Sequence, residues 1–280
     1  MRIVVCLKQI RFTYARTGRN PEEFFLSPED SIFRINPYDE IALEMALCLK
    51  EARGRGEIIL VTLGPIIAEN ELRRCLAMGA DEIYQIDEKE EIDTWRKSVL
   101  LARAIKELEA DVVLCGKESL DTQNGQVGAF IAHSLDLPFV SAVMDLAVKG
   151  DQDVEVRRSA GRGIREIIEC RLPAVFSVEM GVHEPRLPTY EDKKKSQSTQ
   201  IRCLSYPEED CQAKTYSAGI IQPRPRPKEV PAPDSGLDSF ERIQQLLAGS
   251  RIDKKGEILM GDPESQAENI ISFLKRNNIV

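Results

Sequence analysis

The chain has 280 residues, of which 42% are hydrophobic and 30% charged, enough for one large or two small globular domains with a sizeable core. Its net charge of −8 argues against a nucleic-acid partner, and no apolar run approaches the roughly 20 residues that span a bilayer, so an integral membrane protein is not expected. Seven scattered cysteines without C-x-x-C spacing, a start directly in a strand pattern without a signal peptide, and only two histidines predict a reduced, cytoplasmic protein without a metal site.

The first third of the chain alternates between strand and helix patterns. Short apolar runs predict strands, and apolar residues three and four apart predict helices. Residues 11–34 show neither period and are expected to form a long loop or hairpin excursion. The predicted elements are a strand at Arg2–Leu7, a helix at residues 40–52 capped by Asn36 or Asp39, a strand at residues 57–62 and a helix at residues 69–78.

The alternation continues through the middle of the chain. Strands are predicted at residues 81–86, 111–115 and 138–144, separated by helices at residues 94–108 and from Val127 onward. Strands that are separated by helices form βαβ units, in which the strands run parallel. The predicted fold is therefore α/β with a mostly parallel sheet.

The pattern changes after residue 150. Residues 153–158 and 163–170 alternate around a Gly-containing turn and predict an added β-hairpin, and residues 172–178 predict another strand. Residues 185–233 lack periodicity, and the Pro-rich part at 223–233 indicates an extended C-terminal arm. Two amphipathic helices, at residues 238–247 and 263–276, follow. We expect an α/β domain at residues 1–184, a loop and extended linker at 185–235 and a helical arm at 236–280.

Residues 112–128 are the most informative segment: a buried strand, then a polar loop with glycine, then the start of a helix. Ligands of open α/β sheets bind at the carboxyl ends of strands, where loop amides and helix N-termini meet anions. Asp121 and Asn124 are also ordinary turn residues, so this segment alone fits a well-capped helix equally well. The turns Asn36-Pro37 and Leu63-Gly64-Pro65 near other strand ends favour a nucleotide crevice.

Common phosphate-binding and catalytic motifs do not occur in the sequence. No G-x-G-x-x-G follows the first strand, Gly116-Lys117 lacks the upstream glycine of a G-x-x-x-x-G-K-[ST] loop, and no acid/base or nucleophile constellation is present. The acidic run at residues 87–93 is expected to be a solvated face. Lys193-Lys194-Lys195 is expected to be a solvated loop or a basic tip that meets an acidic partner.

A series of short segments, taken in order, resembles the β subunit of an electron transfer flavoprotein, a class related to nitrogen-fixation electron carriers. The resemblance runs from Met1 to about Ile201 and is weaker through the C-terminal arm. The segments are VCLKQ at 5–9, INPYDEIALE at 35–44, VTLGP at 61–65, AMGAD at 77–81, GK at 116–117 with Asp121 and QVG at 126–128, LPAV at 172–175 and EPR at 184–186.

The resemblance implies an adenine-nucleotide α-hydrolase-like fold and an αβ heterodimer, in which one FAD is held chiefly by the α subunit and faces the β subunit. The β subunit itself buries a nucleotide, AMP in most members and a second FAD that accepts hydride from NADH in the electron-bifurcating branch. The C-terminal arm is implied to clasp the α subunit. The implied pocket residues are Cys6, Asn36, Pro37, Tyr38, Asp39, Leu63, Ser119, Leu120, Asp121, Thr122, Gln123, Asn124, Gly125, Gln126, Val127, Gly128, Ala129 and Phe130.

The family's loop for docking acyl-CoA dehydrogenases carries a leucine anchor followed by lysines. In an ungapped match from Pro185-Arg186, Tyr190 takes the anchor position and Lys195 the first lysine, whereas Glu191 and Asp192 replace the usual Pro and Gly. A tyrosine serves well as an anchor in a pocket. The resemblance therefore implies a flavoprotein donor that is adapted to this loop or differs from the usual dehydrogenase.

The segment between the third predicted strand and its helix separates the two branches of the family. The bifurcating branch has a glycine there, whereas residues 87–94 contain none and carry carboxylates that repel the phosphates of a dinucleotide. We therefore expect AMP, and an electron carrier that serves a quinone-reducing or similar acceptor without acid/base catalysis of its own. A bifurcating subunit that uses NADH is the alternative. A further alternative is an ATP-binding regulatory protein of the universal-stress type, which needs a glycine-rich phosphate loop that residues 116–128 do not supply.

Overall fold

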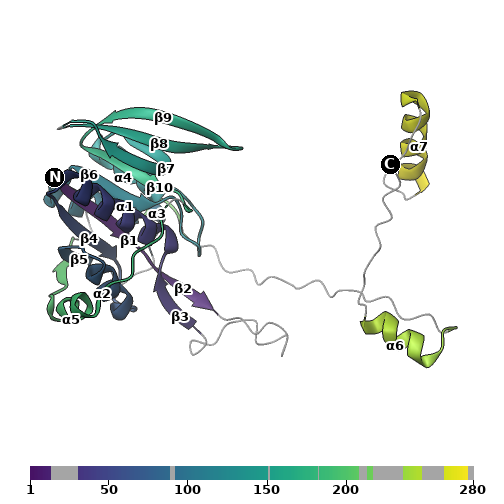
Figure 1. The fold of residues 1–280 in the computed structure, drawn as a ribbon, viewed down its shortest axis with the longest axis horizontal. Coiled ribbons are helices and arrows are strands. Elements are labelled where there is room, and N and C mark those ends of the chain that lie inside the picture. The colour runs from purple at the N-terminus through teal and green to yellow at the C-terminus, as the bar shows by residue number, and fades with distance from the viewer. Residues whose placement is uncertain are drawn as a thin grey trace. The chain divides into compact units, whose positions relative to one another are not determined.

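The computed structural model describes residues 1–13, 31–88, 92–150, 152–181, 183–207, 213–216, 236–247 and 262–276. The chain divides into two compact units, Met1–Ile220 and Ile221–Val280, which can be followed by colour in Figure 1. The predicted extended arm at residues 223–233 lies outside the described residues, as do residues 14–30 of the expected loop excursion and residues 89–91 of the acidic run.

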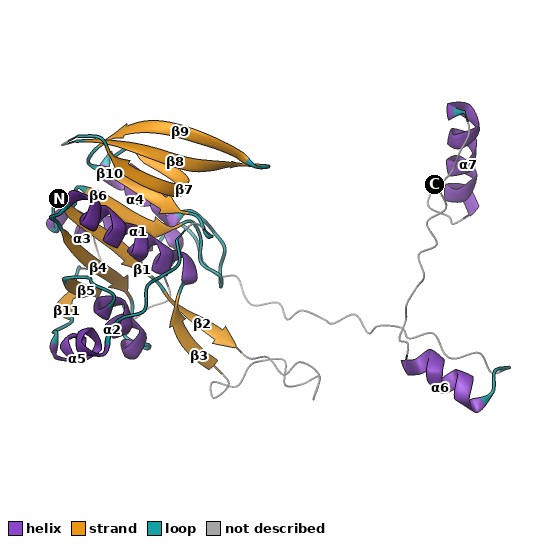
Figure 2. Ribbon diagram, viewed as in Figure 1, coloured by secondary structure: helices purple, strands orange, loops and turns teal. Residues whose placement is uncertain are grey.

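Nine strands of the described chain form one sheet at the centre of the first unit (Figure 2). Their order is β11-β5-β4-β1-β6-β10-β7-β8-β9, parallel as far as β7 and antiparallel from β7 to β9. This confirms the predicted mostly parallel α/β sheet with an added hairpin. The strands are β1 (Arg2–Leu7), β4 (Glu57–Leu63), β5 (Glu82–Ile86), β6 (Val112–Gly116), β7 (Phe139–Val148), β8 (Asp153–Gly161), β9 (Ile164–Arg171), β10 (Ala174–Val178) and β11 (Arg202–Leu204).

Helices cover both faces of the parallel part of the sheet. On one face α1 (Pro37–Arg53) and α2 (Glu69–Ala77) pack against a core that includes Val5 of β1, and on the other α3 (Thr94–Glu107) and α4 (Val127–Leu135) pack against a core that includes Val4. Both valines are fully buried. Burial on both faces explains why β1 and β4 are continuous apolar runs in the sequence.

A second, two-stranded sheet follows β1. Strands β2 (Gln9–Thr13) and β3 (Ser31–Ile35) pair antiparallel, from Gln9 with Ile35 to Thr13 with Ser31. The sequence was compatible with either a loop or a hairpin at residues 11–34, and the structure shows the paired stem of a hairpin.

The absence of regular structure predicted for residues 185–233 is wrong in two places. Residues Tyr190–Ser198 form helix α5, where the Thr189 hydroxyl caps the first turn by accepting from the Asp192 amide at 3.2 Å. Strand β11 then adds to the edge of the sheet beside β5. Helix α5 is polar on nearly every side and buries only Ser196, so it has no apolar stripe for a sequence pattern to detect.

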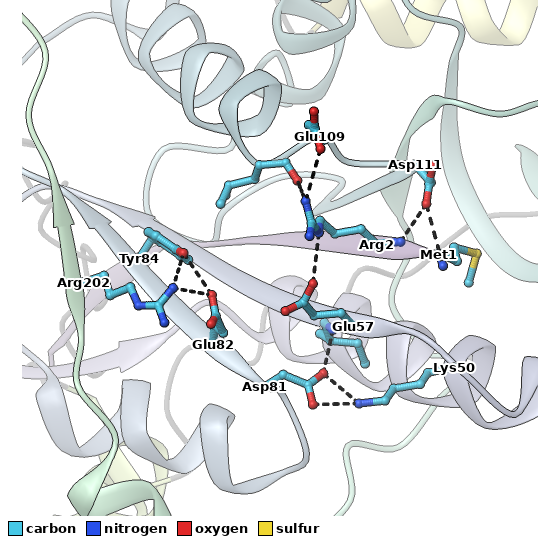
Figure 3. Close-up of polar contacts among 12 residues, drawn as sticks. Met1, Arg2, Lys50, Glu57, Asp81, Glu82, Tyr84, Glu109, Asp111 and Arg202 are labelled. Carbon is cyan, nitrogen blue, oxygen red and sulfur yellow. Dashed lines mark hydrogen bonds and ion pairs between the residues drawn. The ribbon is translucent and has the colours of Figure 1, made fainter.

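Ion pairs occupy the amino ends of the parallel strands (Figure 3). Arg2 at the start of β1 pairs with Glu57 at the start of β4, and its backbone amide donates to Asp111 just before β6 at 2.7 Å. Lys50 of α1 pairs with Asp81 before β5. These charged groups pair with one another at the amino ends, so we expect a ligand at the open carboxyl ends of the strands.

The second unit contains the two predicted amphipathic helices, α6 (Ser239–Leu247) and α7 (Pro263–Arg276). Each exposes large apolar side chains, including Phe240 on α6 and Phe273 on α7. In the described part of the chain, no helix combines the length and apolarity needed to cross a membrane.

Candidate functional site

A cavity of about 230 Å³ opens at the carboxyl ends of β1 and β6. The chain runs from β1 outward to β4 and β5 and then returns to β6 on the other side of β1. Such a reversal of strand order leaves a crevice between the loops that leave the two central strands, because these loops turn to opposite faces of the sheet. The cavity therefore lies where an open α/β sheet most readily binds a ligand.

The structure brings together predicted residues from all of the predicted segments. The predicted residues that line the cavity are Cys6, Asn36, Asp39, Leu63, Ser119, Thr122, Asn124, Gly125, Gln126 and Val127. The others, which lie beside it without lining it, are Pro37, Tyr38, Leu120, Asp121, Gln123, Gly128, Ala129 and Phe130. Tyr190 and Lys195 are both exposed on α5 and belong to a separate surface.

Further lining residues were missed by the sequence reasoning. They are Leu7, Lys8, Gln9, Thr94, Lys97, Leu101, Cys115, Gly116, Lys117 and Glu118. Those around residues 7–9 and 115–118 stand at predicted strand ends, so their position was a usable signal. Those on α3 gave no such signal, because the face that a helix turns toward a cavity depends on its packing.

Asp39 is the centre of the polar structure at the cavity floor. Its carboxylate accepts from the Lys8 amide at 2.7 Å, the Gly116 amide at 2.9 Å and the Asn36 side chain at 3.1 Å, which ties β1, β6 and α1 together. Burial raises the pKa of Asp39 to about 7, although these hydrogen bonds oppose the shift. Asn36 stands at the N-cap position of α1, one of the two expected capping residues, but its side chain makes no capping hydrogen bond to a backbone amide and donates to the Asp39 carboxylate instead.

Two glycines allow helices to approach the end of β6 closely. A Cβ atom on Gly116 would lie 2.3 Å from Asp39 Oδ1 and 2.6 Å from Tyr38 Cβ. A Cβ atom on Gly128 would lie 2.8 Å from the sulfur of Cys115. Both distances are shorter than non-bonded atoms permit, so the first turns of α1 and α4 reach the cavity only because these positions lack a side chain.

Cys6 and Cys115 form an apolar part of the cavity wall. They follow the paired residues Val5 and Leu114 on neighbouring strands. Burial, with Asp39 nearby, raises the pKa of the Cys6 thiol to about 12, and burial also raises that of Cys115. Both thiols are therefore protonated at neutral pH and act as small apolar groups.

The polar loop between β6 and α4 (residues 117–126), called the signature loop below, is held by a lysine from the end of β1. The Lys8 ammonium donates to Asp121 at 2.7 Å, to Ser119 at 3.0 Å and to Thr122 at 3.2 Å. Burial alone would raise the pKa of Asp121, but the hydrogen bond and charge of Lys8 outweigh it and lower the pKa. Asp121 therefore stays ionised and anchors the loop.

The start of α4 offers hydrogen-bond donors at the mouth of the loop. Gln126 precedes the helix without a side-chain cap, and the first turn lacks acidic residues. Uncapped first-turn amides and the positive end of the helix dipole favour an anion at this position. Three lysines also line the cavity, Lys8, Lys97 and Lys117, of which Lys8 and Lys117 pair with Asp121 and Glu179.

Gln9 holds the turn between β4 and α2, which continues the wall from Leu63. Its carbonyl oxygen accepts from the amides of Ile67 at 3.0 Å and Ala68 at 2.7 Å, and its amide nitrogen donates to the Pro65 carbonyl. α2 has no side-chain cap at Ala68, and Gln9 of β2 satisfies the backbone amides that lead into this helix.

The acidic run before α3 is only partly solvated, which corrects the expectation for residues 87–93. The Glu88 side chain is 8% exposed and pairs with Arg96 at 3.0 Å. Asp93 caps α3 by accepting from the Arg96 amide at 2.9 Å. These two carboxylates are satisfied within the chain, so they contribute less repulsion toward a phosphate than the sequence indicated.

Helix α5 presents the predicted docking residues to solvent. Tyr190 is 82% exposed, and the neighbouring Leu187 is 89% exposed. Arg73 of α2 fixes the other end of the helix by donating to the Ser196 carbonyl at 2.6 Å and to the Thr199 carbonyl at 3.0 Å. Tyr190 therefore stands at the start of a helix that is held at its C-terminus, and Leu187 lies just before that helix.

Comparison with known proteins identifies the family. The family model described as "Electron transfer flavoprotein domain" matches residues 29–207, more than half of the chain. The chain belongs to the electron transfer flavoprotein family, as a β subunit. The resemblance seen in the sequence is thereby confirmed, and the universal-stress alternative is set aside.

The similar members of the electron transfer flavoprotein family carry different names. The electron transfer flavoprotein subunit beta of Bacillus subtilis is 32% identical over 249 residues, which cover 86% of this chain and 85% of the relative. The caffeyl-CoA reductase-Etf complex subunit CarD of Acetobacterium woodii is 37% identical, over 66% of this chain and 71% of its own length. Protein FixA of Azotobacter vinelandii is 33% identical, over 69% and 70%.

Proposed function

We propose that this β subunit forms a heterodimer with an electron transfer flavoprotein α subunit and passes electrons from a flavoprotein dehydrogenase to a quinone-reducing or similar acceptor. FAD, held chiefly by the α subunit, supplies the redox chemistry. The β subunit supplies a binding surface and a buried AMP that stabilises it. Free thiols at all described cysteines support a reduced, cytoplasmic setting.

The cavity between β1 and β6 carries the AMP proposal. Its apolar wall of Cys6, Leu63 and Val127 suits a flat base, and the uncapped start of α4 suits a phosphate. Asn124 and Gln126 offer polar groups from the same loop. The residues present therefore fit a mononucleotide, with its anionic end at α4.

The two carboxylates that line the cavity are engaged in holding its walls. Asp39 accepts N–H groups, and Glu118 accepts from the Tyr38 hydroxyl at 3.1 Å. This supports a scaffolding role for the bound nucleotide, since a general acid or base needs an atom that is available to a reacting group.

Two surfaces are proposed for the protein partners. Tyr190 and Lys195 on α5 dock the electron donor, an interpretation supported by the exposure of Tyr190 beside a cluster of lysines. The arm at residues 236–280 contacts the α subunit, supported by the exposed apolar side chains of α6 and α7, such as Phe240 and Ile271.

The test is to purify the αβ complex from its native source and to identify its released nucleotides by mass spectrometry with their stoichiometry. One FAD and one AMP per heterodimer are expected. A complex without flavin absorbance would contradict the electron-transfer proposal, and a flavin-containing complex without an adenine mononucleotide would contradict AMP.

The bifurcating alternative has one structural feature in its favour. The cavity extends to Thr94, Lys97 and Leu101 of α3, beyond the residues that the family resemblance implies for AMP. A longer ligand such as a second FAD would use that wall. Two FAD molecules per heterodimer, no AMP and direct oxidation of NADH would favour this alternative over the AMP-containing carrier.

A further inference from the structure

Asp93 joins two parts of the chain that are far apart in sequence. One carboxylate oxygen caps α3 through the Arg96 amide. The other accepts from the amides of Lys214 at 2.7 Å and Thr215 at 2.9 Å and from the Thr215 hydroxyl at 3.2 Å. Residues 213–216 therefore form a short strap on the start of α3, just before the second unit begins at Ile221.

The side chains next to Asp93 complete the strap's attachment. The Lys214 ammonium lies 3.5 Å from the centre of the Trp95 ring, a cation–π contact. On α4, Phe130 meets the Trp95 ring edge to face, with centroids 5.5 Å apart. Trp95 is the single tryptophan of the chain, so the tryptophan fluorescence of the isolated chain reports on the surroundings of this one ring.

The same turn of α3 forms part of the nucleotide cavity. Thr94, between Asp93 and Trp95, lines the cavity, and its hydroxyl accepts from the Asn124 side chain of the signature loop at 3.2 Å. Lys214 and Thr215 themselves do not line the cavity. A change in the strap would therefore reach a bound nucleotide only through α3.

We propose that Asp93 and Trp95 are positioning residues that couple the strap to the nucleotide cavity, so that seating of the strap tightens nucleotide binding and a bound nucleotide holds the strap down. This inference rests on the proposed function of the cavity as an AMP site. The coupling is reciprocal, since both effects are one free energy.

Lys214→Met tests the effect of the strap on the cavity. This variant removes the cation and keeps an apolar stem on an exposed side chain, so the fold is retained. With AMP as the titrated probe, its Kd is expected to rise about two- to fivefold, the range of one cation–π contact. Lys149→Met, on an exposed lysine of the β7–β8 turn, is the matched control and is expected to bind AMP as the unaltered chain does.

Trp95 fluorescence separates the possible failures. An altered emission in Lys214→Met with an unchanged Kd for AMP would show a real contact without coupling and would overturn the inference. If the unaltered chain does not bind AMP in the same titration, the AMP assignment itself fails and the coupling falls with it.

Asp93→Asn tests the same coupling at the carboxylate. This variant places an amide group against N–H donors and is expected to weaken AMP binding more than Lys214→Met does, by about tenfold. Asp87→Asn, on the exposed carboxylate before Glu88, is its matched control.

The reciprocal effect is measured by proteolysis of the αβ complex with trypsin. Saturating AMP is expected to slow the appearance of the fragment that ends at Lys214, by about the factor that strap loss costs in AMP affinity. Cleavage in Asp93→Asn is expected to be fast with or without AMP. An equal rate with and without AMP in the unaltered chain would overturn the coupling.

Discussion

Gly116→Ala is expected to damage both the fold and the cavity. The added Cβ would lie 2.3 Å from Asp39 Oδ1, whereas ordinary contacts begin at 3.4 Å, so the start of α1 would have to move by about 1 Å. Overpacking of this kind costs ~1 to 3 kcal/mol. Weakening the hydrogen bond from the Gly116 amide to the buried Asp39 carboxylate adds ~1.5 to 3 kcal/mol. Together these two effects predict a loss of ~2.5 to 6 kcal/mol in the free energy of unfolding.

Urea unfolding followed by circular dichroism measures this loss, and titration with AMP measures the effect on the cavity. The matched control is Gly150→Ala, where an added Cβ meets nothing within 4 Å. It is expected to change the free energy of unfolding by less than ~0.5 kcal/mol. If Gly116→Ala were as stable as Gly150→Ala, the close approach of α1 to β6 would not constrain this position and the reasoning would be refuted.

Three further outcomes are expected. Burial raises the pKa of Asp39 from 3.8 to about 7, so the folded state favours the protonated form, and its stabilising contribution is lost as the pH rises through that window. Relative to Asp39→Asn, the free energy of unfolding of the unaltered chain in urea should therefore fall by ~2 to 3 kcal/mol between about pH 5 and pH 8. A difference between the two proteins that stays constant with pH would contradict this. Arg186→Ala removes the guanidinium that pairs at 2.8 Å with the Glu44 carboxylate, which is only 8% exposed, and should lower the free energy of unfolding in urea by ~2 to 3 kcal/mol. The control Arg157→Ala, at an exposed pair, should lower it by less than ~1 kcal/mol. Equal losses in the two variants would argue against a stabilising role of the buried pair. Tyr190→Ala should change the free energy of unfolding by less than ~0.5 kcal/mol but raise the KM for the donor dehydrogenase about tenfold in a flavin-reduction assay. Reduction of the flavin by dithionite should be unchanged. An unaltered KM would exclude Tyr190 from the docking surface.

The succession of strands and helices along the first unit of the chain was predictable from local patterns. Strands such as β1 and β4 are buried on both faces and therefore appear as continuous apolar runs, and α3 shows the spacing of one buried helical face. Helix α5 escaped prediction because its stability comes from Thr189 at one end and Arg73 at the other. These contacts leave no periodic signal in the sequence.

By itself, the sequence determined which residues stand at the strand ends, and through the family resemblance it indicated a nucleotide pocket there. Only the tertiary structure decided that β6 lies beside β1, which places the signature loop against Lys8. It also decided that Asp39 is a buried junction and that Lys97 of α3 faces the cavity. The reason is physical: a residue's place in a strand or helix follows from nearby side chains, whereas strand order and the face that a helix turns inward follow from burial across the whole core.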